Sequence, residues 1–384
     1  MELIRAAADG NLDRVRLLMN QGVKVNARHK NGMTPLLAAA VTGHVDIVQA
    51  LLVQGADLKA RYRNEATVLI LAATQGEADV VELLLNRGAN PNEHAKEGST
   101  ALLAASISGH PEVVKKLLNR GSDVDLADEK GVTPLLGAVI NGHAQVASML
   151  LAAGANVGAR TAAGLSVSAA AATADPAVLR VLLENGGDAN ARDEQDRPCI
   201  VIAAANGMLD NVNLLLAAGA GLEATTDDGT TAIIAAAVNG YKDIVGTLAD
   251  KGADIDAQTD AGTTALLASV LRGHADVAET LIGRGAEVNR QNPSGVSALM
   301  AAASQNPDSV PVLLQHGADP SMADRDGVTA LMAAVISGHE DAVRALLAAG
   351  ADPHAETASG VNALQMAQAA DQLIIAELLR QATE

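Results

Sequence analysis

Histidine is the side chain that could supply the most chemistry in this sequence, because it binds metals and transfers protons near neutral pH. Five of the nine histidines share one setting, directly after a glycine: His44, His110, His143, His274 and His339. They recur at one position of a repeated pattern, so their side chains are expected to lie at least one structural unit apart. Since a His–metal bond is only about 2 Å long, the spacing predicts a role in the structure and no metal site.

Two groups of spaced aspartates have the residue type that binds calcium: Asp123, Asp125 and Asp128, and Asp254, Asp256 and Asp260. A calcium-binding loop also needs a glycine at its sixth position and a glutamate at its end. Neither group fits that register, so both are expected to be turns between helices.

The single cysteine, Cys199, would need an activating base or cation to act as a nucleophile. It occupies a position where the repeated pattern has a small capping residue, so a packing role is predicted. Gly219-Ala220-Gly221 lacks the third glycine of a dinucleotide-binding loop, and the sequence motifs of zinc proteases, thiol redox sites and P-loops do not occur. We therefore expect no catalytic, cofactor-binding or metal site, and no enzyme.

The elements that must position these residues form a repeat. The segment Gly32-Met33-Thr34-Pro35-Leu36 recurs in variants along the whole chain. The residues equivalent to Thr34 are Thr67, Thr100, Thr133, Ser166, Cys199, Thr231, Thr264, Ser297, Thr329 and Asn362. The interval between them is constant except at two short steps, each of which lacks a single residue. Met1 falls one period before Thr34, so an incomplete unit begins the sequence.

Each unit predicts the same elements. Thr is a good N-cap and Pro fits the first helical position, as in Thr34-Pro35. A short helix rich in Leu and Ala follows and ends at Gly-His, as at Gly43-His44. A second helix ends at Gly-Ala-Asp or Gly-Ala-Asn, as at Gly55, and a turn-rich connector leads onward. Thin layers of small aliphatic residues pack without aromatics, which suits a chain that is 49% hydrophobic and 1% aromatic.

This pattern resembles the ankyrin repeat, whose period is about 33 residues and whose signature is T-P-L-H-x-A. The resemblance covers essentially the whole chain. It implies an all-α solenoid of helix-turn-helix units with short β-hairpin-like fingers, curved into an arc with the fingers and first helices on the concave side. One domain over residues 1–384 is expected, with a partial unit at 1–22, ten full repeats at 23–361 and a terminal unit at 362–384.

The chain departs from the family pattern in ways that bear on packing. The family's histidine is absent throughout, and an apolar residue such as Leu37 stands there, which favours apolar packing between units. Asp175-Pro176 replaces Gly-His in one unit, where Asp can cap and Pro can begin the second helix. Glu65 and Arg197 are aligned with the glycine that precedes the Thr position elsewhere.

The two short steps predict two irregular places in the stack. The alignment places the missing residues near Asn206-Gly207 and near Asn306-Pro307, at the end of the first helix of each unit. We expect the stacking of neighbouring units to be least regular there.

The resemblance also places residues that could bind a partner. The seventh residue after the Thr position lies at the end of the first helix, on the face expected to be concave. It is aliphatic in six units, Val41, Ile107, Ile140, Val238, Leu271 and Ile336, and polar in three, Thr74, Thr173 and Ser304. A row of exposed aliphatic side chains forms an apolar groove, which usually marks a binding site. The other interpretation is that these side chains are partly buried between neighbouring units.

The predicted finger tips carry charge. Lys30, Arg61 and Arg63 make the early fingers basic, and Tyr62 lies between the two arginines. Because Tyr and Arg are enriched among residues that dominate binding energy, Tyr62 is the first candidate, against the alternative of an ordinary solvated tip. Later fingers are acidic at Asp196, Asp227, Asp228, Asp260 and Asp326.

The net charge of −18 lies almost wholly in the second half of the chain. Residues 1–192 hold 18 Lys and Arg against 19 Asp and Glu, whereas residues 193–384 hold 9 against 26. Such a surface argues against nucleic acid and anionic membranes as partners. It would steer a protein with a basic patch toward the second half, although solubility alone would also explain it.

These features predict a protein–protein interaction scaffold or adaptor that binds a partner protein along its concave face. A regulatory or inhibitory subunit that occludes an enzyme or membrane protein would use the same surface and stays open as the alternative. We expect a monomer or a member of a hetero-complex. No apolar run reaches the roughly 18 residues that span a bilayer, and residues 1–15 lack the apolar core of a signal peptide. An intracellular soluble protein is expected, cytoplasmic unless a targeting peptide has been removed.

Overall fold

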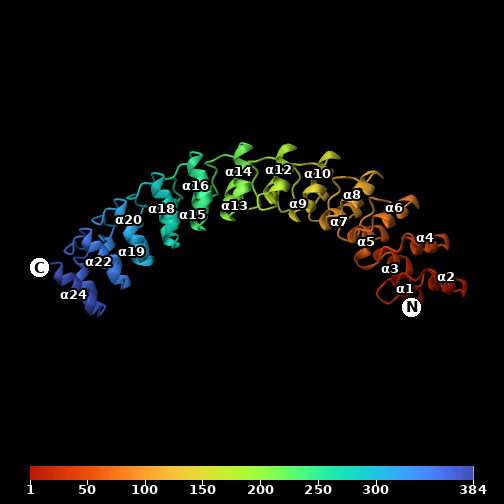
Figure 1. Ribbon diagram of the computed structural model, residues 1–384, viewed down its shortest axis with the longest axis horizontal. Coiled ribbons are helices and arrows are strands. Elements are labelled where there is room, and N and C mark those ends of the chain that lie inside the picture. The colour runs from red at the N-terminus through yellow and green to blue at the C-terminus, as the bar shows by residue number, and fades with distance from the viewer. Residues whose placement is uncertain (384) are drawn as a thin grey trace. The chain divides into compact units, whose positions relative to one another are not determined.

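The computed structural model describes residues 1–383 and divides the chain into two compact units, Met1–Gln195 and Asp196–Glu384. Each unit is a succession of short helix pairs, which the colours of Figure 1 follow along the chain. Within each unit, first helices pack on first helices of the next pair, and second helices on second helices. In the described part, extended structure is limited to isolated antiparallel bridges such as that between Arg61 and Thr67. The predicted all-α repeat solenoid is confirmed.

The helix pairs have nearly constant lengths. In residues 1–195 they are α1 (Glu2–Ala8) and α2 (Leu12–Asn20), α3 (Pro35–Val41) and α4 (Val45–Val53), α5 (Val68–Gln75) and α6 (Ala78–Asn86), α7 (Ala101–Ser108) and α8 (Pro111–Leu118), α9 (Pro134–Ile140) and α10 (Ala144–Ala152), and α11 (Val167–Ala171) and α12 (Pro176–Glu184), with a 3-10 turn η1 (Arg63–Glu65) before α5. In residues 196–383 they are α13 (Cys199–Ala205) and α14 (Leu209–Ala217), α15 (Ala232–Val238) and α16 (Lys242–Asp250), α17 (Ala265–Leu271) and α18 (Ala275–Gly283), α19 (Ala298–Gln305) with η2 (Pro307–Ser309) and α20 (Val310–Gln315), α21 (Ala330–Ser337) and α22 (Glu340–Ala348), and α23 (Ala363–Ala369) and α24 (Leu373–Gln381).

The first helices begin as predicted. The Oγ1 atom of Thr34 accepts a hydrogen bond from the backbone N–H of Leu37 at 3.3 Å, and Pro35 is the first helical residue. The same side-chain cap occurs at Thr67, Thr100, Thr133, Ser166, Thr264, Ser297 and Thr329. Leu36 and Leu37 are buried, and burying one such side chain contributes about 1.5–3 kcal/mol. These repeated layers of Leu and Ala form the core.

The register at Cys199 differs by one residue from the prediction. Pro198 is the N-cap of α13, with φ −64° and ψ 145°, and Cys199 is the first helical residue and fully buried. Proline fits this extended cap because its φ is fixed near −65°. The residue at the glycine position is therefore Asp196, whose φ is 57°, and the assignment of Arg197 to that position is wrong.

The first short step consequently lies in a different unit. The interval from Ser166 to Pro198 is shorter by a single residue than the interval from Pro198 to Thr231, which has the usual length. The missing residue therefore falls between α11 and α12, and the placement near Asn206-Gly207 is wrong. The shortening is visible in α11, which has five residues where α13 has seven.

The unit that contains α11 and α12 keeps its second helix. Asp175 accepts a hydrogen bond from the N–H of Ala177 at 2.8 Å, and Pro176 is the first residue of α12, as predicted. The second short step lies at Asn306-Pro307, also as predicted, and there the second helix is divided into η2 and α20.

The recurring histidines join neighbouring units. The Nε2 atom of His44 lies 3.1 Å from the carbonyl oxygen of Ala8, and a Cβ on Gly10 would lie 2.6 Å from the same ring. The four other histidines of this position reach the carbonyl 36 residues earlier in the same way, at 2.9–3.1 Å: His110, His143, His274 and His339. In one of the units that lack the histidine, the Nδ2 atom of Asn306 donates to the carbonyl of Val270 at 2.6 Å. The structural role predicted for the histidines is confirmed.

The aspartate groups link neighbouring fingers. The backbone N–H of Asp123 donates to Oδ1 of Asn92 at 2.7 Å, and Asp123 in turn accepts from the N–H of Asp125 at 3.0 Å. Oδ1 of Asp125 accepts from the N–H of Asn156 in the following finger at 2.9 Å, and Asp256 makes the same link to the finger that follows it. These contacts confirm that the aspartates belong to turns.

Candidate functional site

The aliphatic row reaches the surface at the end of the first helices. Ile107 of α7 is 39% exposed, Ile140 of α9 is 53% exposed and Ile336 of α21 is 61% exposed. The other three members of the row, Val41, Val238 and Leu271, are half-buried. The residue just before each of the six is buried: Ala40, Ser106, Val139, Ala237, Val270 and Val335. The last turn of these helices thus brings one aliphatic side chain per unit to the surface, which is exposed in three units and half-buried in the other three.

The first compact unit holds the best-defined part of this row, the α7–α9 strip, formed by Ile107 and Ile140. The two side chains lie on first helices that pack directly against each other. Gly137 of α9 faces the earlier helix, and a Cβ on it would lie 2.8 Å from Cγ1 of Ile107 and 3.3 Å from Cδ1 of Leu103. Because the glycine leaves this space, Ile107 rests on the backbone of α9 while its exposed part faces solvent.

The second compact unit carries the remaining members of the row. Val238 and Leu271 end the neighbouring helices α15 and α17, and both are half-buried. Ser304 follows on α19 and interrupts the aliphatic pattern before Ile336 on α21. The most exposed member of the row in this unit, Ile336, is therefore separated from its half-buried companions by the whole helix pair that begins with α19.

Arg61, a predicted contact residue, holds neighbouring fingers together. Its Nη1 atom donates to the carbonyl of Glu65 at 2.8 Å and to the carbonyl of His94, in the next finger, at 3.1 Å, and its guanidinium also pairs with Glu93. The preceding finger reaches back, since Nη2 of Arg28 donates to the carbonyl of Arg61 at 2.8 Å. Arg61 is half-buried by these contacts, a role that sequence reasoning missed.

Tyr62 and Arg63 form the tip of the same finger. The guanidinium carbon of the exposed Arg63 lies 5.6 Å from the ring centroid of the half-buried Tyr62, which is cation–π geometry. Asn64 and Glu65 follow with φ of 54° and 58°, a left-handed conformation that costs non-glycine residues about 1–2 kcal/mol each. Lys30, on the preceding finger, is exposed. The finger tip thus combines an aromatic–cation contact with two residues in a strained backbone conformation.

The acidic finger residues of the second unit all face solvent. Asp227, Asp228, Asp260 and Asp326 are exposed. The carboxyl of Asp228 accepts hydrogen bonds from Thr226 and from Thr230. These bonds lower its pKa, and the bond from the Thr226 side chain contributes most. The backbone carbonyl of Asp228 accepts from the N–H of Asp260 at 2.9 Å, so the main chain stacks the fingers and the carboxylates point outward. The result is a row of negative charge at neutral pH.

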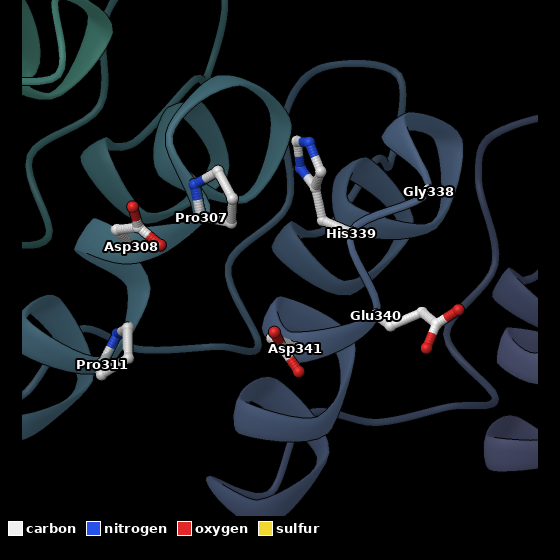
Figure 2. A pocket seen from close by; sticks show the side chains of 7 residues that line it. All are labelled: Pro307, Asp308, Pro311, Gly338, His339, Glu340 and Asp341. Carbon is white, nitrogen blue, oxygen red and sulfur yellow. The ribbon is translucent and has the colours of Figure 1, made fainter.

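A hollow of about 520 Å³ lies where the second short step divides the helix. Figure 2 shows Pro307, Asp308 and Pro311 on one side of it and the start of α22 on the other, with the carboxylate of Glu340 turned away from the prolines.

Within residues 1–383, no group of three or more His, Cys, Asp or Glu side chains could hold a metal ion. Cys199, the one thiol, is buried.

The sequence contains a signal for the close contact between Ile107 and the backbone of α9 at Gly137. The first helix at 134–140 reads PLLGAVI, where the one at 35–41 reads PLLAAAV, so a glycine interrupts an alanine position. The contacts of Arg61 left no comparable signal, because they depend on where the next finger lies.

Among residues 1–383, every helix is too short or too polar to span a bilayer.

Comparison with known proteins identifies the fold family. A family model that describes three consecutive ankyrin repeats matches the chain six times, at residues 3–95, 69–161, 167–259, 200–292, 257–324 and 299–383. A search of curated proteins finds none that matches the chain. The matched segments together extend over nearly all of the sequence and agree with the stacked helix pairs, the Thr caps and the linked fingers. The chain therefore belongs to the ankyrin-repeat family.

Proposed function

We propose that this protein is a scaffold or adaptor that binds a partner protein through its aliphatic row and finger tips. Ankyrin repeats are generally protein–protein interaction modules. The single observation that carries the proposal is the α7–α9 strip, where Ile107 and Ile140 expose 39% and 53% of their surface on two neighbouring helices. Neighbouring exposed aliphatic side chains of this kind are typical of binding sites.

The proposed partner spans surfaces of different charge. An apolar segment contacts the aliphatic row, and a basic patch faces the acidic fingers at Asp227, Asp228, Asp260 and Asp326. Opposite charges across an interface raise the rate of association and fix its orientation. Tyr62 and Arg63 present a pre-shaped aromatic and cationic tip, the residue types that are enriched at binding hot spots.

The test compares the proteins captured by the wild-type chain and by the double variant Ile107→Ser/Ile140→Ser, using quantitative mass spectrometry. The matched control is Val53→Ser, because Val53 is 67% exposed but lies on the second helix α4. We expect a specific partner to be retained by the control and lost by the double variant. Equal capture by all three would contradict the proposal, and so would unfolding of the double variant as seen by circular dichroism, since the residues would then be core.

A regulatory subunit would use the same surface. The captured partner's own activity, measured with and without this chain, separates a regulator from an adaptor: a regulator changes that activity, and an adaptor leaves it unchanged.

A further inference from the structure

Three successive finger tips in the first compact unit carry a cation at the same repeat position. Lys30, Arg63 and Lys96 each lie four residues before the Thr that caps the following first helix. All three side chains are exposed. The same position of the next finger is Glu129, where the series ends. We call Lys30, Arg63 and Lys96 the cation row.

Hydrogen bonds between the fingers hold these tips next to one another. The backbone N–H of Lys96 donates to the carbonyl of Asn64, the residue after Arg63, at 2.8 Å. The first finger is joined to the second by Arg28, whose Nη2 atom donates to the carbonyl of Arg61 at 2.8 Å. The cation row therefore runs across three adjacent fingers whose main chains are linked.

The charged groups of the cation row are free of ion pairs. Arg61, two residues before the row in the second finger, is paired with Glu93. In the part of the chain that the structure describes, no carboxylate pairs in this way with Lys30, Arg63 or Lys96. Ammonium and guanidinium groups have several N–H donors each, so the row presents these donors to solvent.

Tyr62 adds an aromatic surface beside the middle of the row. Its half-buried ring has the guanidinium carbon of Arg63 at 5.6 Å from the centroid. A cation that lies over a ring is oriented by it and keeps its N–H donors for an anion. The second finger thus offers an anion-binding group and an apolar contact together.

The acidic side chains near the cation row decide between two classes of anionic ligand. Glu65 and Glu97 follow the second and third cations closely in the sequence, both are exposed, and Glu129 ends the row. Nucleic acid presents a regular series of phosphates, some of which would face these glutamates. A protein segment can place carboxylates opposite the cations and neutral or basic side chains opposite the glutamates. The pattern of signs therefore favours a protein segment.

We propose that the cation row binds an acidic segment of the partner protein, extended along the first three fingers, with Tyr62 as its apolar contact. This inference rests on the proposed function, because it gives the chemistry of one segment of that partner. Carboxylates accept charge-assisted hydrogen bonds from Lys30, Arg63 and Lys96, and the planar guanidinium of Arg63 can bind one of them in bidentate fashion. A basic side chain opposite Glu129 fixes the direction of the segment.

The chain supplies its own reporter for this site. Tyr62 is the single tyrosine of residues 1–195, Tyr241 is the other tyrosine of the chain, and the sequence has no tryptophan. In the variant Tyr241→Phe, tyrosine emission therefore comes from Tyr62 alone. A decaglutamate peptide, added up to about 1 mM, should change this emission in a saturable way. About 0.1 M salt shortens the Debye length to about 10 Å and limits repulsion from distant acidic residues.

Neutralising the row tests its part in binding. The triple variant Lys30→Gln/Arg63→Gln/Lys96→Gln should bind fluorescein-labelled decaglutamate more weakly by a factor of roughly five or more, as measured by fluorescence anisotropy. It should resist urea at least as well as the wild type, because neighbouring like charges repel each other and the variant removes that repulsion. A loss of binding is then separate from a loss of folding.

A matched control removes the same charge elsewhere in the first unit. The triple variant Arg16→Gln/Lys24→Gln/Lys115→Gln changes exposed residues of α2, of the connector after α2 and of α8, away from the finger tips. It should bind the peptide like the wild type. Equal weakening in the two triple variants would overturn the proposal, because net charge alone would then explain the binding.

Two further results would also overturn the proposal. One is the absence of a saturable change in Tyr62 emission, and the other is stronger competition for the site by a deoxythymidine decamer than by unlabelled decaglutamate, which would assign the row to nucleic acid. The variant Ile107→Ser/Ile140→Ser should bind the peptide like the wild type. The peptide experiment can therefore succeed or fail independently of the capture experiment on the α7–α9 strip.

Discussion

Ile107 rests on Gly137: a Cβ on the glycine would lie 2.8 Å from Cγ1 of the isoleucine. The two residues belong to neighbouring first helices, α7 and α9. The same contact therefore packs two repeats together and supports the exposed side chain of Ile107. A glycine inside a helix is unfavourable by roughly 1 kcal/mol relative to alanine. The chain accepts that disadvantage at the residue on which Ile107 of the α7–α9 strip rests.

Gly137→Ala should therefore have opposite effects in two backgrounds. In the wild type, the new methyl group collides with Ile107 and costs about 1–3 kcal/mol, which outweighs the gain in helix propensity. In the Ile107→Ala background the collision is gone, and the same substitution should stabilise the protein by about 1 kcal/mol. Urea denaturation of the four proteins in this cycle measures both effects. Equal effects in both backgrounds would show that the two residues do not interact.

The hydrogen bond from Asn306 to Val270 should contribute to the free energy of unfolding, although it lies near the surface. Asn306→Ala leaves the carbonyl of Val270 without this partner, and we expect a loss of about 1–2 kcal/mol in the free energy of unfolding. Asn141→Ala is a useful control, because the Asn141 side chain bonds only within its own unit, to Gly137. The free energies come from chemical denaturation followed by circular dichroism, and equal losses in the two variants would contradict the cross-unit role.

Glu65→Gly should stabilise the protein. Glycine adopts the φ of 58° at this position without the steric cost of about 1–2 kcal/mol that a side chain incurs, although the greater freedom of the unfolded chain offsets part of the gain. We expect a net increase of about 0.5–1 kcal/mol in the free energy of unfolding. Glu65→Ala keeps the strain and should give no increase. A stabilisation by alanine as large as that by glycine would point to the charge instead of the backbone.

Arg284 should control the ionisation of Asp250. Its Nε atom donates to Asp250 at 2.9 Å, and this hydrogen bond holds the pKa of Asp250 below its usual value of 3.8. The pair therefore stabilises the folded state above pH 3.8 and loses this effect as the pH falls through the lowered pKa. Arg284→Ala should return the pKa of Asp250 toward 3.8 in an NMR titration, whereas Arg272→Ala should leave it unchanged. A low pKa that survives Arg284→Ala would require another cause.

Salt should slow the binding of the proposed partner. If the acidic fingers of residues 196–384 attract a basic patch, the association rate should fall as ionic strength rises, because the Debye length shortens from about 10 Å at 0.1 M to about 3 Å at 1 M. The double variant Asp227→Asn/Asp228→Asn should reduce this dependence. Stopped-flow measurements supply the rates, and a rate that does not change with salt would remove the electrostatic part of the proposal.

Much of the fold could be predicted because it depends on local chemistry that repeats. The Thr caps, the proline starts and the histidine position recur at a fixed period, so each unit supports the assignment of the others. The prediction failed at Pro198-Cys199, where two adjacent residues could both be aligned with the cap. The backbone decides in favour of Pro198, whose fixed φ suits an extended cap, and that choice moved the missing residue from α13–α14 to α11–α12.

The candidate site was predictable in outline only. The period identified the aliphatic row, but the exposure of each side chain depends on the residue that faces it from the next helix, as Gly137 faces Ile107. The same limit applies to Arg61, whose acceptors Glu65 and His94 lie in two different fingers. Such contacts depend on how each repeat is positioned on its neighbour. The spacing of residues within one repeat does not determine that position.

The bonds from His44 to Ala8 and from Asn306 to Val270 have a consequence for how the protein is made. Each joins residues 36 positions apart, so the contacts that hold a unit in place come from the sequence just before it. Chains dominated by such short-range contacts fold quickly, and repeat arrays can begin folding at more than one place. During synthesis, each new helix pair can dock on the previous one soon after leaving the ribosome, well before the last residue has been translated.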